Sequence, residues 1–158
     1  MGFFRMNNKN AVYSPAEGDI FPLEELNDGV FSKKLLGDGI GFRFKGDTIC
    51  SPCYGEVIMV ARSRHAVGIR LKNGAEVLLH IGLDTVELNG KGLKVYAKKG
   101  DSVRPGEPLI QLDLAVMQAS GIDLSSALII TNGDAYSFCP SLPKEAHTKD
   151  LLFAIDRR

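Results

Sequence analysis

Turn-forming residues interrupt this sequence so often that few segments are long enough to form a helix. Glycine and proline together account for 24 of the 158 residues, and they gather in short clusters at residues 37–39, 72–74, 89–92 and 99–101. The intervening segments have room for strands of about five to seven residues, close to the usual strand length. Turn clusters alternating with short apolar segments are typical of β proteins.

Helical structure is expected in only two places. Residues Leu114–Ser120 follow Asp113, which is a favourable N-cap residue, and a single turn is expected at residues 30–34. We therefore expect an all-β fold, a compact antiparallel β-sandwich or barrel with minor short helices and no interdomain linker.

Two pairs of segments repeat within the chain. Residues 14–20 and 51–57 share the pattern Ser-Pro-x-x-Gly-acid-β-branched, offset by 37 residues, and the apolar positions of residues 103–112 recur 43 residues later at 146–155. In each pair a turn leads into a short apolar strand. The repeats predict a β fold built from two similar halves.

The three cysteines do not form a disulfide framework, because their number is odd and the chain is long enough to bury a core. Cys50 and Cys53 form a CxxC pair, yet no second pair completes a zinc site and no helix is expected after Cys53. In the first repeat Tyr13 and Ala16 occupy these two positions. We expect reduced thiols, and we interpret the CxxC pair as part of an internal repeat and not as a redox or metal motif.

Charge and apolar patterning exclude two classes of partner. Nineteen basic residues balance nineteen acidic residues, which removes the basic surface typical of nucleic-acid binding. The longest apolar runs fall far short of the ~18 residues that span a bilayer, and we expect no secretory signal because the first residues lack an apolar h-region. We expect a cytoplasmic protein with neither a nucleic-acid partner nor a direct membrane span.

Two histidines flank a predicted hairpin. Asn73-Gly74 between two β-like segments is a strong signal for a two-residue turn, and this turn would place His65 opposite Gly82. In that register His65 and His80 are diagonal neighbours on one face, with Cβ atoms roughly 7–8 Å apart. Gly82 would leave space for an approaching group.

The same register places Val67, Ile69 and Leu78 on the histidine face. These side chains would form an apolar rim around a shallow depression. Paired imidazoles there disfavour simultaneous protonation, so at least one ring should stay neutral near pH 7. A neutral ring nitrogen can act as a nucleophile or as a metal ligand.

Three functions fit such a pair. The first is phosphoryl transfer through a histidine, and no nucleotide-binding motif accompanies it. The second is a zinc-dependent hydrolase that uses His65 and His80 with Asp84 or His147 as a further ligand. The third is a purely regulatory protein-binding module. His147 occupies the place of Arg104 in the repeat, which is a solvent-facing turn position.

The segment from Gly74 to Val86 resembles the active-site signature of the glucose-type enzyme IIA domain of the bacterial phosphoenolpyruvate-dependent sugar phosphotransferase system. It matches the order Gly, two variable residues, three apolar residues, His, apolar, Gly, apolar, any residue, Thr, apolar. The Gly-Asp-Gly segment at 37–39 and His65 also resemble family positions. The similarity extends from about Tyr13 to Asn132.

The resemblance implies a duplicated hybrid-motif β-sandwich at residues 13–158, with residues 1–12 as an N-terminal extension. It implies that His80 accepts a phosphoryl group on Nε2 from the phosphocarrier protein HPr and passes it to a cysteine of an enzyme IIB domain. The protein would thus be a phosphotransferase component with a phosphohistidine intermediate and with no cofactor or metal. His65 would support the phosphoryl group, with Ser63 at the position of an assisting threonine. The C-terminal region departs from the family pattern, since Lys144 and Lys149 stand where glycines are expected.

Overall fold

A computed structural model describes residues 8–26, 28–139 and 142–158. The strands are β1 (Ala11–Tyr13), β2 (Gly18–Pro22), β3 (Asp38–Phe44), β4 (Thr48–Cys50), β5 (Gly55–Val60), β6 (Ala66–Arg70), β7 (Glu76–His80), β8 (Leu93–Val95), β9 (Ser102–Val103), β10 (Pro108–Leu112), β11 (Ser126–Ile130), β12 (Tyr136–Ser137), β13 (Glu145–Ala146), β14 (Leu151–Ala154) and β15 (Asp156–Arg157). Short 3-10 helices are η1 (Asn8–Asn10), η2 (Leu23–Glu25), η3 (Thr85–Leu88) and η4 (Gly133–Ala135), and the α-helix is α1 (Leu114–Ser120).

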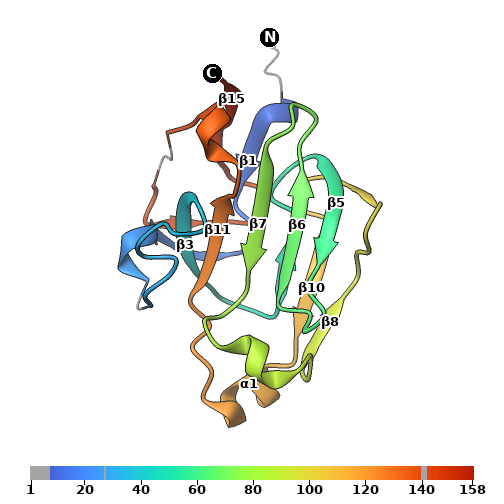
Figure 1. The fold of residues 1–158 in the computed structure, drawn as a ribbon. Coiled ribbons are helices and arrows are strands. Elements are labelled where there is room, and N and C mark those ends of the chain that lie inside the picture. The colour runs from blue at the N-terminus through green and yellow to red at the C-terminus, as the bar shows by residue number, and fades with distance from the viewer. Residues whose placement is uncertain (1–7, 27, 140–141) are drawn as a thin grey trace.

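The strands form open antiparallel sheets. The largest sheet has the order β13-β2-β3-β11-β7-β6-β5-β9, a second has the order β4-β10-β8, and β1-β14 and β12-β15 form two small pairs. Strands β11, β7, β6 and β5 lie side by side, and β7 runs toward the end of the molecule that carries α1, away from β15 (Figure 1). The all-β sandwich is therefore confirmed, and the sheets among the described residues do not close into a barrel.

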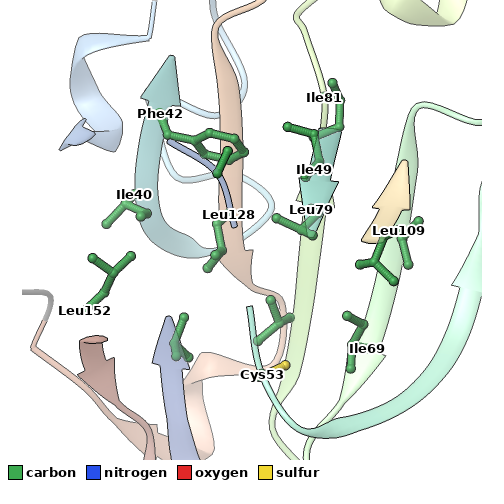
Figure 2. Packing of buried hydrophobic residues seen from close by; sticks show 14 of the residues in the cluster. Ile40, Phe42, Ile49, Cys53, Ile69, Leu79, Ile81, Leu109, Leu128 and Leu152 are labelled. Carbon is green, nitrogen blue, oxygen red and sulfur yellow. The ribbon is translucent and has the colours of Figure 1, made fainter. Parts of the chain in front are cut away.

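The core lies between the large sheet and the β4-β10-β8 sheet. Ile69 and Leu79 of the large sheet are fully buried with Ile49 of β4 and Leu109 of β10, as Figure 2 shows. Alternate residues of β7 point into this core, because side chains on a strand alternate between its two faces. Full burial of one such side chain contributes about 1.5–3 kcal/mol.

The sequence repeats correspond to matching hydrogen bonds. The Ser14 N–H donates to the Asp150 carbonyl at 2.7 Å, and the Ser51 N–H donates to the Glu107 carbonyl at 2.8 Å. Ser51 follows Ser14 by the 37-residue offset, and Asp150 follows Glu107 by the 43-residue offset, so the two hydrogen bonds join equivalent positions of the repeats. The two halves predicted from the repeats therefore meet in equivalent ways, and the duplication is a property of the fold.

Lys149 occupies a position where the family pattern has glycine. Its φ is +77°, in the left-handed region, and its repeat counterpart Gly106 has a φ of +87°. The Lys149 side chain lies over Gly106, since a Cβ on Gly106 would be 2.5 Å from Lys149 Cδ. The turn thus keeps the backbone of a glycine turn, and one repeat's lysine packs against the other repeat's glycine.

The CxxC segment overlaps the Ser-Pro repeat at residues 51–57, and both of its cysteines are buried. The Ser51 hydroxyl donates to the Cys53 carbonyl, as the Ser14 hydroxyl donates to the Ala16 carbonyl. Cys53 is fully buried, and burial raises the pKa of its thiol to about 12. Burial also raises the pKa of Cys50, and neither thiol is in a disulfide.

Native thiol reactivity tests this placement. Cys139 is exposed, whereas Cys50 and Cys53 are buried. We expect only Cys139 to react rapidly with Ellman's reagent in the folded protein, because a buried thiol with a raised pKa supplies little thiolate. All three should react after unfolding. A Cys139→Ser variant should lose the rapid phase, and a rapid phase that persists in this variant would contradict the burial of the CxxC pair.

The expected helical segments are present. Helix α1 spans Leu114–Ser120, and the Asp113 carboxylate accepts hydrogen bonds from the Ala115 and Val116 N–H groups. A turn at residues 31–34 confirms the second prediction. Strand β1 begins at Ala11, and residues 1–7 of the proposed extension lie outside the described residues, so the domain boundary at residue 13 stays a prediction. The helices described contain no segment long and apolar enough to cross a membrane.

Candidate functional site

The turn between β6 and β7 differs from the predicted two-residue turn. Ala66 lies opposite His80, one residue away from the expected partner. The Leu71 N–H donates to the Ala75 carbonyl, the Gly74 N–H donates to the Leu71 carbonyl, and Gly74 has a φ of +93°. These contacts define a three-residue loop that ends in a left-handed glycine, a common alternative for hairpins.

This change of register moves the predicted apolar rim. Val67 and Ile69 are fully buried in the main core, on the face opposite His80. A one-residue shift exchanges the two faces of a strand, so their placement on the histidine face was wrong. Leu78 does share the face of His80, where it is half-buried against a second apolar cluster.

His65 lies next to His80 although it is outside β6. It is the last residue of the β5–β6 loop, in which the Ala61 carbonyl accepts a hydrogen bond from the Arg64 N–H and Arg64 has a φ of +64°. The His65 carbonyl accepts from the Ile81 N–H at 2.8 Å. The two imidazole ring centroids are 4.8 Å apart with an interplanar angle of 77°. The predicted proximity is confirmed, and the loop produces it.

A backbone carbonyl fixes the orientation of the His80 ring. His80 Nδ1 is 2.9 Å from the Gly82 carbonyl oxygen. Because a carbonyl only accepts hydrogen bonds, Nδ1 carries the proton and the Nε2 lone pair is available. Gly82 has a φ of +74°, and a Cβ at this position would lie 2.5 Å from Thr85 Cγ2. The space expected at Gly82 is therefore filled by Thr85.

A loop segment before β3 covers the His80 ring. The Phe31 ring centroid is 4.8 Å from that of His80. The Asp28 carboxylate holds this turn by accepting hydrogen bonds from the Phe31 and Ser32 N–H groups, each at 3.0 Å. The surrounding cluster consists of Leu23, Leu26, Phe31, Ala127 and Ile129, with Phe21, Leu78 and Leu83 packed against it. The sequence predicts the turn at residues 30–34 but carries no signal for its contact with His80.

Both imidazoles are neutral near pH 7. Burial, assisted by His65, lowers the pKa of His80 to about 4, against the opposing effects of the Gly82 carbonyl and Asp28. Burial also lowers the pKa of His65, and the nearby Ser63 backbone partly opposes this shift. His65 Nδ1 itself is buried and has no hydrogen-bond partner within hydrogen-bonding geometry among the described residues.

The lowered pKa of His80 predicts a loss of stability in mild acid. Below pH 6.5 the unfolded chain takes up a proton on His80 that the folded protein does not bind until about pH 4. The free energy of unfolding should therefore fall through this interval, by about 3 kcal/mol from this group. Urea unfolding of the wild type and a His80→Asn variant at pH 7 and pH 4.5 measures the difference. Equal losses in both proteins would contradict a neutral buried His80.

The other candidate residues lie apart from the pair or make no specific contact. Ser63 is half-buried in the β5–β6 loop, and its hydroxyl makes no hydrogen bond to the described residues. Asp84 is exposed, and His147 pairs with Glu17 at 3.0 Å. Within residues 8–26, 28–139 and 142–158, no three His, Cys, Asp or Glu side chains form a metal-ligand cluster.

Comparison with known proteins identifies relatives across most of the chain. The family described as "phosphoenolpyruvate-dependent sugar phosphotransferase system, EIIA 1" matches residues 10–136. The chain is 41% identical over 133 residues to the β-glucoside-specific EIIBCA component of Bacillus subtilis, covering 84% of this chain and 22% of that protein. It is 41% identical over 123 residues to the glucose-specific EIIA component of Staphylococcus epidermidis, covering 78% and 74%.

A solved structure shares the architecture. Glucose permease IIA of Mycoplasma capricolum superposes with a TM-score of 0.82 at 34% sequence identity, covering 98% of this chain and 99% of that one. Fold and relatives together define a phosphocarrier of the β-sandwich class. The chain belongs to the EIIA 1 family of the phosphoenolpyruvate-dependent sugar phosphotransferase system. The relatives support neither a purely regulatory module nor a zinc hydrolase.

Proposed function

We propose that His80 accepts a phosphoryl group on Nε2 from phospho-HPr and passes it to the cysteine of an enzyme IIB domain. The observation that carries this proposal is the hydrogen bond from His80 Nδ1 to the Gly82 carbonyl. It leaves Nε2 unprotonated as the nucleophile. As the new Nε2–P bond forms, the bond from phosphorus to the donor breaks, and the proton stays on Nδ1, where it remains hydrogen-bonded to the Gly82 carbonyl.

His65 has a distinct part in this proposal. Its ring lies beside the His80 ring, 4.8 Å between centroids, so a ring N–H can donate a hydrogen bond to a phosphoryl oxygen as the group transfers. Because the His65 ring is neutral, it can donate one hydrogen bond without electrostatic repulsion of His80. We assign Ser63, two residues earlier in the same loop, an assisting hydroxyl.

Phosphoryl mapping tests this proposal. The protein is incubated with phosphoenolpyruvate, enzyme I and HPr, and the product is examined by ³¹P NMR and by acid treatment. The expected product carries one acid-labile phosphoryl group, with a chemical shift that identifies the Nε2 position of a histidine. An acid-stable phosphate, or a label that persists when His80 is replaced, would overturn the assignment.

The recipient is proposed from the relatives and from the chemistry of the site. The name of the Bacillus subtilis relative joins EIIB, C and A components in one protein, which supports an enzyme IIB domain as the partner. The free thiols Cys50 and Cys53 fit a reducing compartment, and we place the reaction in the cytoplasm.

Partner docking should depend on exposed apolar side chains next to Phe31, which contacts His80, and next to Thr85, which packs against Gly82. Val30 adjoins Phe31 and is 41% exposed, and Val86 of η3 is 48% exposed. Replacing Val86 with Asp should raise the KM for phospho-HPr roughly tenfold, because a charge would be desolvated in the interface, while the melting temperature stays unchanged. Steady-state transfer kinetics measure this effect.

The matched control for Val86→Asp is Leu151→Asp. Leu151 is 53% exposed on β14, in the small β1-β14 sheet. The control adds the same charge to another exposed apolar position and should leave the KM unchanged. An equal rise in both variants would show that net charge, and not docking at η3, sets the affinity.

A further inference from the structure

The Arg64 side chain connects the loop that carries His65 to a chain segment that follows His80. Arg64 precedes His65, and its Nη1 donates to the Leu93 carbonyl at 3.4 Å. Its aliphatic part lies over Gly90, where a Cβ would be 3.4 Å from Arg64 Cδ. Gly90 has a φ of +87°, so the absence of a side chain and the left-handed backbone both make room for Arg64.

The segment that Arg64 contacts is firmly attached to the end of β7. The Thr85 hydroxyl of η3 donates to the Ile81 carbonyl, and Thr85 is fully buried. The chain then turns at Asn89, whose φ is +53°, and the Lys91 N–H donates to the Leu88 carbonyl at 3.0 Å. Contact with Gly90 and Leu93 therefore ties the β5–β6 loop to the structure that follows His80.

The Arg64 side chain borders an open surface hollow, so solvent lies on one side of the loop. The hollow has a volume of about 700 Å³, and Arg64 lines it together with residues 90–94. Among the described residues, the His65 backbone accepts one hydrogen bond, from the Ile81 N–H, and the His65 ring contacts the His80 ring. Arg64 is also in the left-handed region, a conformation that a non-glycine residue keeps only when its surroundings hold it.

We propose that Arg64 is a positioning residue that holds the His65 ring against His80 by clamping the β5–β6 loop to the turn between η3 and β8. This inference deepens the proposed function, because the support of the phosphoryl group by His65 requires this ring arrangement. It concerns a residue outside the histidine pair, and it acts through His65 without touching the transferred group.

Ring proximity and transfer kinetics test the proposal in Arg64→Ala. We expect the NOE between the His65 and His80 ring protons to be lost or strongly weakened. The kcat for phosphoryl transfer should fall roughly 10- to 100-fold, since small displacements of catalytic groups have effects of this size. The KM for phospho-HPr should change by less than about twofold, because ground-state docking is intact. Arg64→Lys, which keeps the long aliphatic part and an N–H donor, should restore most of both signals.

Arg62→Ala is the matched control. Arg62 is exposed in the same loop, and its side chain makes no hydrogen bond to the described residues, so this variant removes the same charge without releasing the clamp. It should leave the NOE and kcat unchanged. Equal losses in Arg62→Ala and Arg64→Ala would overturn the proposal in favour of a charge effect, and an intact NOE in Arg64→Ala would also overturn it.

The NOE measurement still tests the positioning role of Arg64 if the proposed function itself is wrong. A wild-type protein that takes no phosphoryl group from HPr would refute the phosphocarrier assignment of His80, yet the ring contact and its dependence on Arg64 would still be measured. Thermal melts of each variant verify that the fold is retained, because a globally unfolded protein would lose every NOE.

Discussion

His80→Asn is expected to abolish phosphoryl acceptance while leaving the fold intact. The asparagine amide can still donate to the Gly82 carbonyl, as His80 Nδ1 does, so the local structure keeps its partner. It provides no nucleophilic nitrogen at the Nε2 position. Removal of a nucleophile lowers turnover by on the order of 10³-fold or more. Incubation with radiolabelled phosphoenolpyruvate, enzyme I and HPr should therefore give no acid-labile label on this variant.

A His65→Asn variant distinguishes the proposed nucleophile, His80, from the residue proposed to support the phosphoryl group, His65. His80 stays neutral and keeps its Nε2 lone pair, so label should still accumulate on His80. Its transfer should slow by roughly 10²-fold, the usual cost of removing one donor to a developing charge. Complete loss of label in His65→Asn, or retained label in His80→Asn, would reverse the roles assigned to the two rings.

Gly82→Ala is expected to damage both stability and activity. Gly82 has a φ of +74°, and an added Cβ would lie 2.5 Å from Thr85 Cγ2 and 3.2 Å from the Asp123 carbonyl oxygen. The backbone cost and the overpacking together should lower the free energy of unfolding by about 2–4 kcal/mol. Relief of the clash would turn the Gly82 carbonyl away from His80 Nδ1, so the rate of phosphoryl acceptance should fall as well.

Gly121→Ala isolates the backbone contribution. Gly121 ends α1 with a φ of +66°, and a Cβ there would meet no atom within 4 Å. This variant should lose only about 1 kcal/mol and should keep full activity. Urea unfolding and transfer kinetics of both variants measure the contrast. Similar losses in the two proteins would show that the packing around Gly82 does not hold the site.

The proximity of His65 and His80 could be predicted from the sequence. The register of the β6–β7 hairpin, on which that prediction was based, could not. Asn-Gly favours a two-residue turn locally, but distant contacts select the three-residue loop. Asn73 Nδ2 donates to the Ile155 carbonyl at 2.9 Å, and the Tyr136 hydroxyl donates to the Asn73 carbonyl at 2.8 Å. These partners lie 82 and 63 residues away along the chain. No local pattern around Asn73 contains that information.

Other parts of the fold followed from local signals to different degrees. The repeated Ser-Pro turns predicted the duplicated halves, since each turn supplies its own hydrogen bonds through Ser14 or Ser51. The contact of Phe31 with His80 was missed, because it joins a loop to a strand that is distant in sequence. Asp28 three residues before Phe31 is a local capping signal, and it marks the turn without revealing what the turn covers.

The hydrogen bond between His80 Nδ1 and the Gly82 carbonyl also bears on how partners would distinguish the two states that the proposed function implies, with and without a phosphoryl group on Nε2. A substituent on Nε2 leaves that hydrogen bond in place, so loading the ring requires no rearrangement of the backbone beneath it. The principal difference between the loaded and the unloaded protein is then electrostatic: an uncharged imidazole surface gains up to two negative charges. A partner that releases the phosphorylated protein would need only a carboxylate facing His80 Nε2. A partner that binds the phosphorylated protein would need a guanidinium at the same position.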